Sequence, residues 1–180
     1  MLAAEAVTAA VVLSAQPEHT RSLESAAAAP RMQATSLGGG RTDALLARVR
    51  ADLPGAVAAV DSFWGDDWPR QIDVVATGTE AEFVARAHLD PRRSWDDIAA
   101  VSVADDIDPT SRRVSGQRIV LAPGASAMSG SALRIVLTHE LFHVAARADT
   151  ALDAPRWLTE GVADFVARPP APLPPGAAAD

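Results

Sequence analysis

The chain has 180 residues, a net charge of −7 and an apolar fraction of 48%, which suit one ordinary domain with tails. The acidic balance argues against a nucleic-acid partner. Cys, Lys and Tyr are absent, so the sequence excludes disulfides, thiolate metal sites, a P-loop lysine and a catalytic phenol. Imidazole chemistry must use the four histidines, which are His19, His88, His139 and His143.

Residues 1–41 are expected to lie outside the folded domain. The start, MLAAEAVTAAVVLSAQP, has the apolar stretch of a secretory signal but lacks a basic residue before it; an Ala-rich helix is the alternative. The polar, Gly-rich residues 16–40 indicate a flexible linker. Because no run of 18 apolar residues occurs, membrane association would depend on this incomplete N-terminal segment. A secreted or membrane-associated bacterial protein is favoured over a cytoplasmic one.

The first half of the expected domain combines helices and strands. Apolar residues recur at helical spacing from Leu45 to Trp64, and Pro54 is expected to break or kink this helix. Thr79 and Glu82 form a capping-box pattern at the start of the next helix. That helix is expected over residues 79–89. Strands are expected over 72–76, 98–103 and 118–121, and a polar loop over 105–116. The last two strands are expected to form a hairpin-like pair.

Two adjacent helices are expected at the C-terminal end of the domain. The first runs from Ser129 or Ser131 to about residue 147, and the second covers 155–167. Residues 169–180 are rich in Pro and Ala and read as a disordered tail. This order of elements predicts an α+β fold with a small mixed or antiparallel sheet over residues 42–168.

The first of these two helices contains HELFH, an HExxH motif. His139 and His143 are four residues apart, so one helical face carries both imidazoles and both can reach one metal ion. Glu140 lies at the edge of this pair, where it can hold a zinc-activated water and act as general base. The alternative is an amphipathic helix with incidental histidines.

A catalytic zinc site needs a third protein ligand and one open position. The short link packs the two helices antiparallel, which allows Glu160 to complete the ligand set. Asp164 lies one turn further on the same face, where it can accept the second ring N–H of a ligating histidine. We therefore predict one Zn²⁺ ion, held by His139, His143 and Glu160.

HELFH followed by WLTEGVADF resembles the gluzincin zinc metallopeptidases, and most closely the peptidase MA-like family. The resemblance extends over about 42–167 and implies a zincin-like fold with an active-site helix and an adjacent C-terminal helix. It makes His139, His143 and Glu160 the zinc ligands and Glu140 the general base. The implied activity is hydrolysis of peptide bonds in a peptide or protein substrate.

The resemblance also implies that the outer strand of the hairpin pairs with an extended substrate through main-chain hydrogen bonds. The residues of that strand would be Ala99, Ala100, Val101, Ser102 and Val103.

Two departures from these enzymes leave a second interpretation open. The link between His143 and Glu160 is shorter than in thermolysin-like members, and no Tyr is present to stabilise an oxyanion. The candidates to replace that Tyr are Arg147, Arg156 and His88. The alternative function is a truncated, non-catalytic zinc-binding module related to gluzincins. A further alternative is that a longer protein supplies the missing donor.

Overall fold

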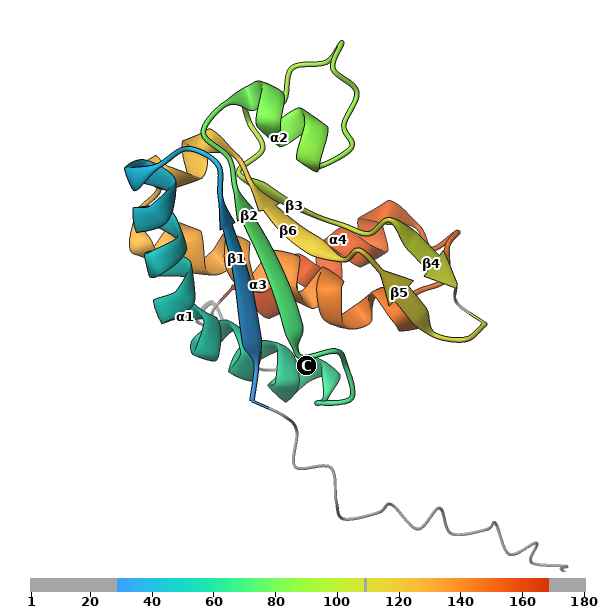
Figure 1. The fold of residues 1–180 in the computed structure, drawn as a ribbon. Coiled ribbons are helices and arrows are strands. Elements are labelled where there is room, and N and C mark those ends of the chain that lie inside the picture. Colours follow the sequence, from blue (N-terminus) through green and yellow to red (C-terminus); the bar gives the residue numbers. More distant parts are fainter. Residues whose placement is uncertain (1–28, 109, 169–180) are drawn as a thin grey trace, which may run out of the picture.

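The computed structural model describes residues 29–108 and 110–168 (Figure 1). Within these residues the fold is mixed α+β, as expected, with a small sheet and four α-helices. The expected signal-like segment before residue 29 and the tail at 169–180 lie outside the described residues. Within the described part, no helix is both long and apolar enough to cross a membrane.

In chain order the elements are β1 (Arg31–Ser36), α1 (Gly40–Trp64), β2 (Gln71–Ala76), α2 (Glu80–Arg86), β3 (Ala100–Val103), β4 (Asp106–Asp108), β5 (Arg113–Ser115), β6 (Arg118–Leu121), η1 (Pro123–Ala127), α3 (Gly130–Ala146), η2 (Arg147–Asp149) and α4 (Arg156–Ala167). Here η denotes a 3-10 turn.

The main sheet has the strand order β1-β2-β6-β3. Strands β1, β2 and β6 are parallel, whereas β3 runs antiparallel to β6, which confirms the predicted pairing of these two segments. Strand β3 therefore forms one edge of the sheet. Strands β4 and β5 form a separate antiparallel hairpin beyond the end of β3 (Figure 1).

Alternating side chains give the sheet two apolar faces. Val74 and Ala76 belong to the larger core, which also contains the buried residues of α1 and α3. Val75 and Val120 point to the opposite face and pack with Phe83 of α2. Figure 1 shows α3 behind the sheet and α2 above its upper end. Helix α3 therefore packs against the sheet and contacts its edge strand β3.

The predicted linker is wrong at residues 31–36, which form β1. This strand lies at the edge of the sheet and pairs in parallel with β2, from Arg31 opposite Gln71 to Ser36 opposite Ala76. Most of its side chains are exposed, so the sequence lacks the apolar alternation that marks a strand. Main-chain pairing with β2 stabilises β1 instead.

Helix α1 continues through Pro54 and is not broken there. A proline inside a helix removes one hydrogen bond and costs about 3 kcal/mol. Here Leu53 and Val57, on either side of Pro54, are both buried in the larger core. Tertiary packing therefore outweighs the local preference to end the helix.

Two further predictions need adjustment. The expected polar loop at 105–116 contains the β4–β5 hairpin. Helix α2 has the predicted capping box of Thr79 and Glu82 but ends at Arg86. His88, at φ 54°, adopts the left-handed conformation, which an α-helix cannot continue through.

Candidate metal centre

Helix α3 is held in place by its apolar face. The side chain of Ser129 accepts a hydrogen bond from the main-chain N–H of Ala132 and caps the helix. Phe142, inside the HExxH sequence, packs edge-to-face on Trp64 and Phe63 of α1, with ring centroids 5.5 and 6.0 Å apart. These contacts fix the rotation of α3 and turn its two histidines toward α4.

Helix α4 follows Pro155, whose fixed φ suits a helix start. Ala163 is fully buried in the larger core, and Val162 packs against that core. The small side chain of Ala163 allows α4 to lie close to α3. Glu160 and Asp164, one turn apart, then face His139 across the helix pair.

The three predicted ligands converge. Nε2 of His139 lies 3.1 Å from Nε2 of His143 and 3.2 Å from Oε2 of Glu160. The third separation, from Nε2 of His143 to the same carboxylate oxygen, is 3.5 Å. The two histidines and Glu160 form a group of partly buried residues that could hold a metal ion.

The donor set and spacing fit a tetrahedral ion. Zinc binds imidazole nitrogen and carboxylate oxygen at about 2.0–2.2 Å, and a tetrahedron with such bonds separates its ligand atoms by about 3.4 Å. The three separations between the ligand atoms are 3.1, 3.2 and 3.5 Å. Three atoms therefore surround one ion-sized point, and a fourth position can stay open.

Asp164 contacts the other nitrogen of one ligand. Oδ1 of Asp164 lies 3.1 Å from Nδ1 of His139. A proton on Nδ1 would donate to this carboxylate, which leaves Nε2 with its lone pair toward the group of three. Arg168, with Nη2 3.4 Å from Oδ2 of Asp164, holds the carboxylate from its other side.

Glu140 lies inside the fold beside the ligands, and it is only 8% exposed. This burial raises the pKa of its carboxyl, while the nearby His139 acts in the opposite direction. Burial likewise lowers the pKa of the His143 imidazole. The neutral imidazole is the form that binds a metal ion.

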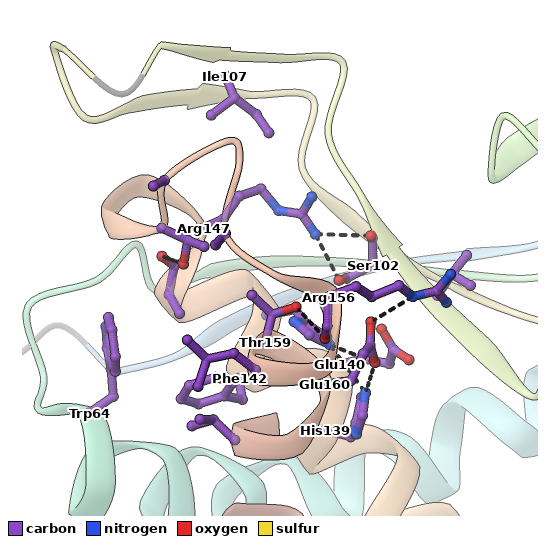
Figure 2. Close-up of a pocket in the computed structure, with 18 of the residues that line it drawn as sticks. Trp64, Ser102, Ile107, His139, Glu140, Phe142, Arg147, Arg156, Thr159 and Glu160 are labelled. Atoms are coloured by element: carbon purple, nitrogen blue, oxygen red, sulfur yellow. Dashed lines mark hydrogen bonds and ion pairs between the residues drawn. The ribbon is translucent and has the colours of Figure 1, made fainter. Parts of the chain in front are cut away.

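A cavity of about 770 Å³ opens in front of these residues. Figure 2 shows Glu140, Glu160 and His139 at one side of it, with Ser102 of β3 across from them. The lining also includes the apolar side chains of Trp64, Phe142 and Ile107. A concave, largely apolar site with a few convergent polar groups is typical of a ligand-binding cleft.

The expected substrate strand lies only partly at this cavity. Ala100, Val101 and Ser102 line it, whereas Val103 packs on the opposite face of the sheet. Ala99 precedes β3, and its carbonyl accepts a hydrogen bond from Ala122 next to β6. Because pairing alternates along an antiparallel strand, the N–H and C=O of Ala100 and Ser102 point away from β6.

The carbonyl of Ser102 already has a partner. Nη2 of Arg147 donates to Ser102 O at 2.9 Å and to Ser102 Oγ at 2.7 Å. Arg147 also lines the cavity, and burial lowers its pKa, against the effect of the nearby Glu140 charge. The sequence marks Arg147 only as a candidate donor, since its contact with β3 depends on the turn that η2 makes after α3.

The other two residues that could replace the missing tyrosine as an oxyanion donor are Arg156, which is exposed to solvent, and His88, which lies away from the cavity. Arg156 lines the cavity but its side chain is 90% exposed, and its Nε lies 3.7 Å from Glu160. His88 contacts Arg118 at 3.0 Å and does not line the cavity. Ile107 and Leu152 also line it. The sequence analysis did not predict these two residues. Ile107 is the single apolar residue of the Asp-rich segment 105–108, and this isolation could have indicated a functional role for it.

Comparisons with protein-family models, curated proteins and solved structures found no match for this chain.

Proposed function

We propose that the chain is a zinc-dependent metallopeptidase of the gluzincin type. The observation that carries this proposal is the convergence of His139, His143 and Glu160 at 3.1–3.5 Å, with the buried Glu140 beside them. Nitrogen and oxygen donors of this kind suit zinc. The cavity in front of them supplies the space for a substrate.

When bound, a zinc ion supplies Lewis-acid chemistry, since it polarises a carbonyl oxygen and lowers the pKa of a water molecule. His139, His143 and Glu160 would hold the ion. Asp164 would keep the proton of His139 on Nδ1 and so direct Nε2 toward the metal position. Glu140 would accept the proton of the attacking water and later pass it to the departing amine.

Strand β3 supports a peptide as substrate. The main-chain groups of Ala100 point from the sheet edge toward the cavity, and no strand of the described residues pairs with that edge. An extended peptide could add to it by main-chain hydrogen bonds, which depend little on the peptide's sequence. The buried Glu140 lies on the helix that contacts this strand.

Metal analysis of the purified protein tests the site. We expect one equivalent of zinc in the wild type and a large loss in His143→Ala, with Glu80→Gln, an exposed residue of α2, as the matched control. Less than a tenth of an equivalent in the wild type, after exposure to excess zinc, would contradict the proposal.

The absence of Tyr from the chain favours one rival, a non-catalytic zinc-binding module. The two functions differ in their response to Glu140→Gln. If zinc binds but no peptide of a broad quenched panel is cleaved, the chain is the module. Cleavage that Glu140→Gln abolishes, at unchanged zinc content, identifies the enzyme.

A further inference from the structure

Arg147 is a cation in the cavity with unused hydrogen-bonding capacity. Nη2 is engaged by Ser102. Nε is buried and has no hydrogen-bond partner within the described residues. A guanidinium offers five N–H donors in a planar fork that matches a carboxylate. Burial of an incompletely paired charge is costly, so the unused donors point to a ligand that is absent from the free protein.

We propose that Arg147 binds the terminal carboxylate of the substrate and makes the protein cleave close to the C-terminus of a peptide. This inference rests on the proposed function. In the reaction, water adds across a peptide C–N bond. The N-terminal part leaves as a carboxylate, and the short C-terminal part leaves with a free amine that takes up the proton.

The edge of β3 supports this assignment, because it ends at Arg147. Ala100 and Ser102 are the residues whose main-chain groups point away from β6. Arg147 occupies the carbonyl of Ser102, so a peptide added at this edge meets the guanidinium there. A peptide that runs in the same direction as β3 and ends at this point places its carboxylate against Arg147, whereas a chain that continues must displace the guanidinium from Ser102.

The β4–β5 hairpin closes the same end of the cavity. Both of its strands contact η2, which begins at Arg147. Arg112, in the turn between the two strands, forms an ion pair with Asp149 of η2 at 2.6 Å. Figure 2 shows Ile107 of the hairpin above Arg147, on the side away from His139. A substrate that passed Arg147 would therefore run into the hairpin.

The charges in the cavity favour an anionic chain end once a divalent ion is held. The carboxyl groups of Glu140 and Glu160 line the cavity beside the metal position, and a bound divalent ion would balance two negative charges there. Arg147 then contributes an additional positive charge, and none of its hydrogen bonds in the described residues goes to a carboxylate. The other cavity arginine, Arg156, is exposed and directed to Glu160.

Two matched peptides test the inference by binding. The probes are N-acetyl-Ala-Ala-Phe-Ala with a free C-terminal carboxylate and the same peptide with a C-terminal amide. Both are titrated calorimetrically into zinc-loaded Glu140→Gln protein, which the proposed mechanism leaves unable to cleave them. We expect the acid to bind at least about tenfold more tightly than the amide, because charge-assisted hydrogen bonds are worth about 1.5–3 kcal/mol.

The preference for the acid should disappear when Arg147→Gln is added to this protein. Arg147→Lys keeps the charge without the fork and should retain part of the preference. Arg134→Gln, which alters an exposed arginine of α3, the helix that ends just before Arg147, should keep all of it. Far-UV circular dichroism confirms that each variant is folded.

Equal binding of acid and amide would overturn the inference, as would a preference that survives Arg147→Gln. Cleavage of quenched peptides by the wild type is measured separately. Failure of that cleavage contradicts the proposed function, whereas the ratio of the two binding affinities tests the role of Arg147 whether or not any peptide is cleaved. A loss of cleavage in Arg147→Gln that is equal for acids and amides would also overturn the inference, since it would assign Arg147 to the reacting carbonyl or to the support of β3.

Discussion

Nδ1 of His139 lies 3.1 Å from Oδ1 of Asp164, although 25 positions separate the two residues in the chain. The contact joins α3 to α4 at the point where the three candidate ligands meet. It leaves only Nε2 of His139 to face Glu160. In the proposed site, Asp164 would therefore set which imidazole nitrogen of His139 is offered to a metal ion.

This relationship predicts the effect of Asp164→Asn. The amide keeps the size of the side chain but loses the charge that holds the proton on Nδ1. We expect zinc affinity to fall about 10–100-fold, measured by competition with a chromogenic chelator. Asp153→Asn, at an exposed position in the α3–α4 connection, should leave affinity unchanged. Equal affinities for all three proteins would contradict the role of Asp164.

Zinc should also stabilise the folded protein, because only the folded chain brings the three ligands together. At a free zinc concentration about 100 times the dissociation constant, the gain is about 2.7 kcal/mol. For a domain of this size we expect Tm to rise by about 10 °C, and EDTA to reverse the change. Glu160→Gln should lose most of the shift, whereas Glu80→Gln should retain it. A Glu160→Gln protein with the full shift would contradict the ligand assignment.

A pair of glycine substitutions tests the position of β1. A Cβ at Gly38, just after β1, would lie 2.6 Å from the Cα of Gly78, which follows β2. We expect Gly38→Ala to lower the free energy of unfolding by more than about 1 kcal/mol. Gly40→Ala meets no atom within 4 Å and should be neutral or stabilising. Denaturant unfolding measures both, and equal effects would contradict the close approach of the two loops.

The continuous helix α1 predicts that Pro54→Ala is stabilising. Pro54 is exposed and its ring removes one main-chain hydrogen bond. Alanine should restore this bond and raise the free energy of unfolding by about 1–3 kcal/mol. Pro155→Ala, at the start of α4, should have a smaller effect, since proline is well tolerated there. A destabilised Pro54→Ala protein would show that the helix is bent in a way that needs proline.

The sequence predicted the residues of the candidate metal site, but it did not predict the edge strand β1. The spacing of His139 and His143 on one helical face is a local property, and the short link to the next helix brings Glu160 near them. By contrast, β1 is mostly exposed and is stabilised by pairing with a strand about 40 residues away. Long-range main-chain pairing leaves little trace in local composition.

The position of the Arg147 guanidinium could likewise not be predicted from the sequence. Helix α3 ends one residue earlier, and the turn η2 decides where the guanidinium goes. Its contact with Ser102 joins residues 45 apart in the chain. The antiparallel pairing of β3 with β6 was predictable, but which main-chain groups remain for a ligand follows only from the register.

The most direct test of the central claim is the initial rate of hydrolysis of a quenched peptide panel by zinc-loaded wild type and Glu140→Gln at equal zinc content. Removal of a general base typically costs 10²–10⁴-fold in rate. We therefore expect the wild type to cleave at least one peptide about 100-fold or more faster than the variant. Equal rates, or no cleavage by fully zinc-loaded wild type, would contradict the assignment as a metallopeptidase.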